Sequence, residues 1–411
     1  MNKIITLAFI LLSNIGLSQT AYVTSGAGSV SVINVATNSL ITTIAVGYIP
    51  ESVSITADGS RVFVANRASN SVSVINTFTN SVIATIPVGN SPAGLAVIPN
   101  GSKVYVSNSG NDSGNTVSVI NTATNSVLDS ITVGSFPFGV AASPDGSKVY
   151  VANLNDGTVS VINTAVDTVM ATIHVGGGPF GVCVSPDGSK LYVSNDPAFT
   201  VTVINTATNT ISTTIQVGSN PGGINISPDG SRVYVSNWAD NTVSEINTAT
   251  NTVFYTIPVG HQPYGICVTP DGTRVYVANG GEDNVSVINT STHAVWANIL
   301  VGNGPLSIGN FISTLGSGFA SLNVEPTVIS IYPNPFSPSA TLSIRNYVPS
   351  LSGMNWEIKI FDVLGQELKS MYIGNQKEIT INKDNLPDGI YFFKLITDDN
   401  KTIGRGKMVI N

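Results

Sequence analysis

Residue types that commonly carry out catalysis are scarce in this sequence. Its 411 residues include three histidines and two cysteines. No C-x-x-C-H haem motif, H-E-x-x-H zinc motif, P-loop or G-x-S-x-G nucleophile elbow is present. His174 lies at a variable strand position and His293 replaces a turn asparagine, so neither indicates catalysis. We therefore expect a protein that is not an enzyme, with no catalytic residue, no metal site and no cofactor.

Aromatic and acidic residues that interrupt an otherwise regular pattern are better candidates for function. Aromatic platforms beside carboxylates suit sugars, and a negative field favours basic peptides or cations. The candidate binding set contains ten residues: Phe138, Phe180, Phe199, Trp238, Tyr264, His261, Asp156, Asp196, Asp240 and Asp283.

The elements that must position these residues form a repeat. The phrase V-[ST]-x-[IV]-N occurs seven times at steps of 42 or 45 residues. Several short strands in a period of this length are typical of a β-propeller, in which each repeat forms one four-stranded blade. One such unit cannot bury its apolar face alone, so the copies must stack around an axis. The phrase ends at Asn34, Asn76, Asn121, Asn163, Asn205, Asn247 and Asn289.

Residues 137–176 illustrate one repeat, with four alternating runs separated by turn residues. We name the four expected strands A to D, from the innermost outward. In the first turn, Pro144 presets the backbone, Asp145 can hydrogen-bond back to it and Gly146 supplies a positive φ. A Lys or Arg follows this turn in six repeats, across the hairpin from the repeated aspartate. We interpret these charges as solvated ion pairs.

The two ends of the array complement each other. The repeats begin at Tyr22 with a strand B and finish with a lone strand A at residues 304–313. We expect this last segment to complete a seventh blade with the N-terminal strands, which pairs both free edges. The expected propeller spans residues 19–313.

The motif Y-V-[ST]-N in a repeat of this length resembles the YVTN-type β-propeller repeats of surface-layer and other secreted microbial proteins. The resemblance implies a seven-bladed propeller, a fold that hosts many unrelated functions. We favour a non-catalytic binding, adhesion or surface-structural module. The alternative is an extracellular propeller enzyme of lactonase or quinone-dependent dehydrogenase type. The regular repeats, with one three-residue insertion near Asn111, leave little room for inserted catalytic residues.

In an up-and-down blade, the D-to-A and B-to-C loops emerge on one face. The candidate binding set falls on these loops and at the start of strand A, around the mouth of the central channel. A glycan, peptide or protein is the ligand we expect there. The alternative is that loop tips vary freely and that the aromatic residues only plug the channel.

The repeat ends after Ser313, and a linker is expected at residues 314–326. Alternating strands at residues 327–411 predict a small Ig-like β-sandwich. This part resembles the type A C-terminal sorting domain of type IX secretion in Bacteroidetes. The resemblance implies export to the periplasm and passage across the outer membrane, with the type IX machinery as partner. The matching residues are Tyr332, Pro333, Asn334, Pro335, Asp362, Gly365, Gly389, Tyr391 and Lys407.

The first 18 residues have the pattern of a signal peptide, with Lys3 before an apolar run and small residues at the exit. No later segment has the ~20 apolar residues of a membrane span, so we expect none in the mature protein. Between residues 19 and 326 there are 16 acidic and 7 basic residues, which disfavours nucleic acid as a partner. The expected location is extracellular or at the cell surface.

Overall fold

The computed structural model describes residues 19–313, 328–332, 334–345, 356–362, 366–374, 376, 378–397 and 402–411. The expected signal peptide (1–18) and linker (314–326) lie outside the described residues, as do Pro333 and Gly365 of the sorting motif. The chain divides into two compact units, Met1–Ala320 and Ser321–Asn411.

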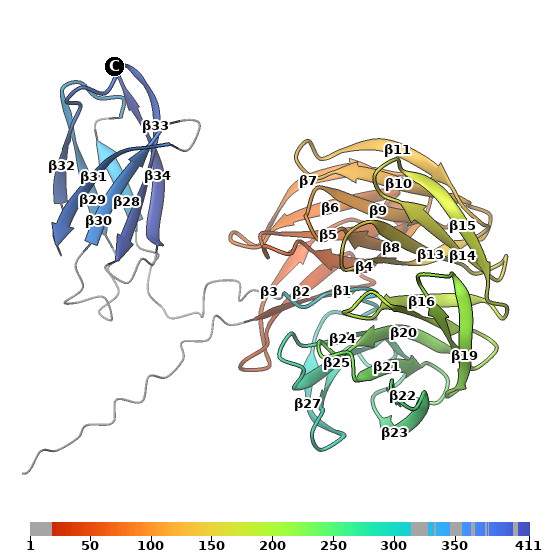
Figure 1. Ribbon diagram of the computed structural model, residues 1–411. Helices are drawn as coiled ribbons and strands as arrows, with labels where there is room; N and C mark the ends of the chain where they lie inside the picture. Colours follow the sequence, from red (N-terminus) through yellow and green to blue (C-terminus); the bar gives the residue numbers. More distant parts are fainter. Residues whose placement is uncertain are drawn as a thin grey trace, which may run out of the picture. The chain divides into compact units, whose positions relative to one another are not determined.

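The first unit is a seven-bladed β-propeller (Figure 1). Six antiparallel four-stranded sheets, β4–β7, β8–β11, β12–β15, β16–β19, β20–β23 and β24–β27, form blades 1 to 6. The three-stranded sheet β1–β3 forms most of blade 7. The fold class expected from the repeat is thus confirmed.

Each strand type recurs with nearly constant bounds. The A strands are β4 (Pro50–Ile55), β8 (Pro92–Val97), β12 (Pro137–Ala142), β16 (Pro179–Val184), β20 (Pro221–Ile226) and β24 (Pro263–Val268). The B strands are β1 (Thr20–Ser25), β5 (Arg61–Asn66), β9 (Lys103–Asn108), β13 (Lys148–Asn153), β17 (Lys190–Asn195), β21 (Arg232–Asn237) and β25 (Arg274–Asn279).

The C strands are β2 (Ser29–Asn34), β6 (Ser71–Asn76), β10 (Thr116–Asn121), β14 (Thr158–Asn163), β18 (Thr200–Asn205), β22 (Thr242–Asn247) and β26 (Asn284–Asn289). The D strands are β3 (Ser39–Ala45), β7 (Ser81–Pro87), β11 (Ser126–Thr132), β15 (Thr168–His174), β19 (Thr210–Gln216), β23 (Thr252–Pro258) and β27 (Ala294–Leu300). A short 3-10 helix, η1 (Arg67–Ser69), follows β5.

Residues 305–313 lie beside β1 as the inner segment of blade 7. Ile312 and Pro305 form antiparallel bridges to Ala21 and Ser25 of β1. The Tyr22 amide donates to the Phe311 carbonyl at 2.8 Å, and Phe311 is fully buried. This segment also contacts blade 1, because the Val53 amide donates to the Ile308 carbonyl at 2.9 Å. Both ends of the array therefore share one blade.

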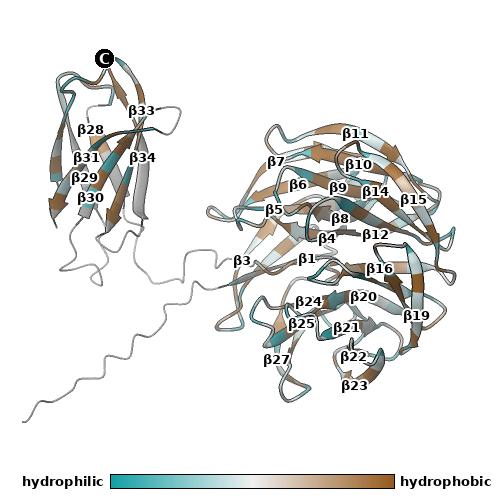
Figure 2. Ribbon diagram, in the orientation of Figure 1, coloured by the Kyte–Doolittle hydropathy of each residue, from teal (hydrophilic) through white to brown (hydrophobic). Residues whose placement is uncertain are grey.

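Apolar side chains fill the space between blades. The aromatic residue of every B strand is buried, from Tyr22 and Phe63 to Tyr276. Figure 2 shows hydrophobic residues recurring along the strands of the blades. The inner strands approach closely because a glycine follows Pro-x in most of them. A Cβ at Gly94 would lie 2.1 Å from the carbonyl oxygen of Phe138, so no larger residue fits there.

The hairpin turns are held by their own side chains. The Asp145 carboxylate accepts the Ser143 hydroxyl at 2.5 Å and the Ser147 amide at 3.0 Å, and these bonds lower its pKa to about 2. The Asn163 side chain accepts the Ala165 amide at 2.9 Å in the C-to-D turn. The Thr164 hydroxyl then donates to the Gly146 carbonyl at 2.6 Å, which ties the two turns together.

The expected ion pairs across the A-to-B hairpin are wrong. Lys148 donates to the Thr206 carbonyl at 3.0 Å, and Lys190 to the Thr248 carbonyl at 3.3 Å. Both acceptors lie in the C-to-D turn of the next blade. The turn aspartate already accepts hydrogen bonds from residues of its own turn. The lysine side chain therefore donates to a carbonyl of the neighbouring blade.

The second unit is a two-sheet β structure with one apolar core. The sheet orders are β28-β29-β32 and β31-β30-β33-β34, and residues from both sheets, such as Leu342 and Ile360, are buried in a single cluster. The strands are β28 (Val328–Tyr332), β29 (Ser339–Arg345), β30 (Trp356–Phe361), β31 (Glu367–Gly374), β32 (Glu378–Asn382), β33 (Gly389–Thr397) and β34 (Thr402–Ile410).

Candidate functional site

The D-to-A and B-to-C loops lie together on one side of the propeller, which we call the loop face. The Trp238 amide donates to the Asn220 carbonyl at 3.0 Å, and the Leu154 amide to the Phe136 carbonyl at 3.0 Å. Each of these bonds joins a B-to-C loop to the D-to-A loop that enters the same blade. The loop positions expected from the repeat are therefore neighbours in space.

Three of the candidate aromatic residues plug the channel mouth at the loop face. Phe138 and Phe180 have ring centroids 4.2 Å apart, and Tyr264 packs edge-on against Phe180 at 5.5 Å. Phe138 is only 2% exposed and packs with Ala93 and Ile308. These side chains close the channel rather than offer an open platform, as the alternative interpretation of the sequence anticipated.

Glu51 is a charged member of this plug that the sequence interpretation missed. It occupies the same position after the inner-strand proline as Phe138, Phe180 and Tyr264, and it is 2% exposed. Burial raises the pKa of Glu51 to about 6, although the Arg67 guanidinium 3.6 Å away opposes the shift. The Tyr264 hydroxyl donates to Glu51 Oε1 at 3.4 Å. Comparing this one position across the seven repeats would have found the residue.

The candidate carboxylates brace the loops. Asp156 accepts the Ser135 amide at 2.7 Å, Asp240 accepts the Ser219 amide at 2.7 Å, and Asp283 accepts the Gly304 amide at 2.8 Å. In each case the B-to-C carboxylate holds the adjacent D-to-A loop. Asp196 instead accepts the Asn220 side-chain amide at 2.8 Å. Partial burial raises the pKa of Asp196, and this hydrogen bond opposes the rise.

Other aromatic residues on the loop face are exposed. Trp238 is 39% exposed, Phe199 is 38% exposed and Tyr48 is 75% exposed. His261 is also exposed and lies 3.5 Å from Glu282. The candidate set thus separates into a buried plug, bracing carboxylates and exposed side chains on braced loops.

A second cluster of ionisable residues lies between blades 5 and 6, away from the candidate set. Glu245 is 1% exposed, in a position that the other repeats fill with valine. It accepts Arg232 Nε at 3.1 Å and pairs with His293 Nδ1 at 2.8 Å. His293 stacks on Tyr255, with ring centroids 4.0 Å apart. His293, which replaces a turn asparagine, thus also bonds a buried carboxylate in the neighbouring blade.

Within the described ranges, no three His, Cys, Asp or Glu side chains are grouped to hold a metal ion. Over the same part of the chain, no helix is long and apolar enough to cross a membrane. Cys183 and Cys267 are free and buried, and burial raises the pKa of each thiol, in the case of Cys267 to about 12.

Several sorting-motif residues hold the turns of the second unit. The Asn334 side chain accepts the Val409 amide at 2.7 Å, and the Asp362 carboxylate accepts the Gln366 amide at 2.9 Å. The buried Tyr391 donates its hydroxyl to the Pro387 carbonyl at 2.7 Å. Tyr332, by contrast, is 81% exposed.

Two family models match this chain. Residues 330–411 match the secretion system C-terminal sorting domain, and residues 226–303 match the YNCE-like β-propeller. The chain is a β-propeller protein with a type IX secretion sorting domain. This sorting domain directs export to the cell surface or the extracellular space. No curated protein sequence matches at a significant level.

Solved structures with the same propeller fold come from several organisms. Hydrazine synthase of Kuenenia stuttgartiensis has 23% identity and a TM-score of 0.60, over 69% of this chain and 99% of its own. A functionally unknown protein of Desulfotomaculum acetoxidans has 19% identity and a TM-score of 0.62, over 71% and 100%. A candidate 6-phosphogluconolactonase of Bacteroides uniformis has 18% identity and a TM-score of 0.60, over 70% and 98%. At these identities the likeness concerns the fold alone.

Proposed function

We propose that the secreted propeller is a non-catalytic binding or adhesion module whose glycan, peptide or protein ligand engages the loop face. In this proposal residues 1–18 are a leader, residues 19–313 form the binding propeller, and residues 327–411 are the address read by the type IX machinery. The candidate binding set contributes in two ways: Trp238, Phe199 and His261 contact the ligand, and the carboxylates hold their loops.

The observation that carries the proposal is the exposure of aromatic side chains on braced loops. Trp238 lies two residues before Asp240, whose carboxylate accepts the Ser219 amide at 2.7 Å. A rigid loop loses little conformational entropy on binding, and exposed aromatic side chains are common binding anchors. The acidic composition favours a ligand with positive or hydrogen-donating groups.

An enzymatic function is the alternative, since two of the structural neighbours carry enzyme names. On the loop face, however, the carboxylates of Asp156, Asp240 and Asp283 accept main-chain amides. The channel mouth between the loops is filled by Phe138 and Phe180. These contacts favour binding at the rim over chemistry in the channel.

The test is a glycan and peptide array probed with the full chain, followed by affinity measurements on two variants. Trp238→Ala should weaken binding of the strongest hit by about tenfold or more, as expected for an aromatic anchor. Trp296→Ala is the matched control, because Trp296 is 58% exposed on the outer strand β27. Equal affinities for Trp238→Ala and wild type, or a loss confined to Trp296→Ala, would place the site elsewhere.

A further inference from the structure

The central channel contains a cavity of about 350 Å³ beneath the aromatic plug. Ile308 packs with Phe138 in the plug and also lines the cavity, so the plug closes one end. Pro99, Pro144, Pro228 and Pro270, from the A-to-B turns, line the other end. The cavity volume falls at the lower end of the range for small-molecule pockets, ~300–1,000 Å³.

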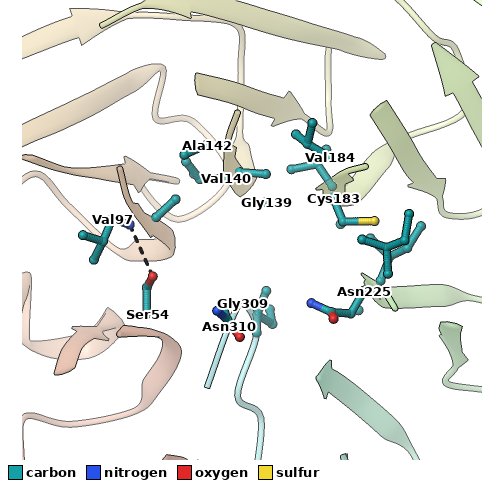
Figure 3. A pocket seen from close by; sticks show the side chains of 18 of the residues that line it. Ser54, Val97, Gly139, Val140, Ala142, Cys183, Val184, Asn225, Gly309 and Asn310 are labelled. Carbon is teal, nitrogen blue, oxygen red and sulfur yellow. Dashed lines mark hydrogen bonds between the residues drawn. The ribbon is translucent and has the colours of Figure 1, made fainter. Parts of the chain in front are cut away.

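The wall of this cavity carries no charged side chain, and apolar side chains alternate there with polar main-chain and side-chain atoms. Val97, Val140 and Val184 are among the apolar lining residues, and Ser54, Asn225 and Asn310 are among the polar ones (Figure 3). Asn225 Oδ1 accepts the Val268 amide at 3.2 Å, and Asn310 Oδ1 accepts the Cys267 thiol at 3.1 Å. These bonds use the oxygen of each side chain, so each Nδ2 group can donate to a molecule in the cavity.

The inner edge of each A strand also presents main-chain amides. In blade 2, the amides of Leu95 and Val97 donate to the hydroxyls of Ser52 and Ser54 of blade 1, at 3.1 and 3.3 Å. Serine hydroxyls of the preceding blade thus accept the hydrogen bonds of the amides along this strand edge.

This arrangement is lost in the next two blades. Ala96 and Ala141 occupy the position of Ser54, and a methyl group cannot accept a hydrogen bond. The amides of Ala142 and Val184, which correspond to that of Val97, therefore face the cavity without a side-chain acceptor. Both residues are half-buried at the cavity wall, so their amides can donate to a molecule in the cavity.

We propose that this cavity binds a small, uncharged molecule with a hydrocarbon part and a carbonyl or ester oxygen. The valine side chains of the wall contact its hydrocarbon part. The amides of Ala142 and Val184 and the Nδ2 groups of Asn225 and Asn310 donate to its oxygen atoms. The ligand enters from the A-to-B turns, so this site is separate from the loop face and does not depend on the function proposed for it.

The test uses methyl octanoate as a probe, titrated calorimetrically into the full chain, with octanoate and nonane as matched compounds. The ester should bind at least about tenfold more tightly than the octanoate anion, because the cavity wall carries no cation to offset its charge. It should also bind more tightly than nonane, which has no oxygen. Failure of the ester to bind, or equal affinity for either matched compound, would overturn the proposal.

Two variants locate the site. Ala142→Ile enlarges a cavity-lining side chain to one that blades 1 and 5 already carry at this position, as Ile55 and Ile226. It should fold normally and bind methyl octanoate at least about tenfold more weakly. Ala141→Ser supplies the hydroxyl that Ser54 supplies elsewhere, and should weaken ester binding several-fold without changing nonane binding. Unchanged ester affinity in Ala142→Ile, with a wild-type melting temperature, would show that the probe binds elsewhere.

Discussion

Glu51→Gln tests the buried carboxyl group in the channel plug. Glu51 is 2% exposed, and burial raises its pKa from 4.5 to about 6. Glutamine has nearly the same shape and cannot ionise. The variant therefore removes the cost of holding a charge in the plug and retains the packing against Tyr264.

The direction of the pKa shift determines whether the folded protein gains or loses stability as the pH rises. A carboxyl whose pKa is raised in the folded protein favours folding when it is protonated, below about pH 4.5, and this advantage is lost as the pH rises through about 6. At 1.36 kcal/mol for each pKa unit, the loss amounts to about 2 kcal/mol. The wild type should thus lose this much stability relative to Glu51→Gln between pH 4 and 7.5.

The assay is denaturant unfolding of both proteins at several pH values, which gives the difference in their free energies of unfolding. That difference should be near zero at pH 4 and about 2 kcal/mol in favour of the variant at pH 7.5. Glu282→Gln is the control, because Glu282 lies on the same face with a 35% exposed side chain. A pH-independent difference, or a less stable variant at pH 7.5, would show that the pair with Arg67 outweighs the cost of burial.

Three further predictions concern the ends of the chain and the cluster between blades 5 and 6. Deleting residues 304–313 should destabilise the propeller by at least about 5 kcal/mol, because three buried apolar side chains leave the core; a calorimetric transition at the parent temperature would contradict the closure. Removing residues 327–411 should leave a folded propeller in the periplasm by cell fractionation, and wild-type amounts outside the cell would argue against the sorting role. The double variant E245V/H293N should melt at or above the wild-type temperature, because it removes a buried carboxylate and restores the residue types that most repeats carry at these positions; a large drop would show that the contact holds the blades together.

Much of the propeller could be predicted from the sequence, because each signal was local and repeated. The seven V-[ST]-x-[IV]-N phrases correspond to seven C strands, each ending at the phrase asparagine. Hairpin turns such as that of Asp145 are held by residues two or three positions away, as their composition indicated. A strand and turn pattern that is repeated seven times is compatible with few folds other than a propeller.

Contacts between residues far apart in the sequence could not be predicted from their sequence neighbours. Lys148 follows Asp145 by three residues, yet it bonds the Thr206 carbonyl, 58 residues later. Within blade 3, the Asp156 carboxylate accepts an amide 21 residues earlier, at Ser135, a contact that the sequence did not indicate. The Glu245–His293 pair joins residues 48 positions apart. Its signal was the replacement of a repeat valine by glutamate, which needs a partner when buried.

The central claim is that the loop face binds the ligand. Hydrogen exchange of the full chain, with and without the strongest array hit, tests it most directly. The account predicts slower exchange in the loops around Trp238, Phe199 and His261, and unchanged exchange in the A-to-B turns such as Pro186–Ser189. Protection confined to those turns, or to the outer D strands, would contradict it.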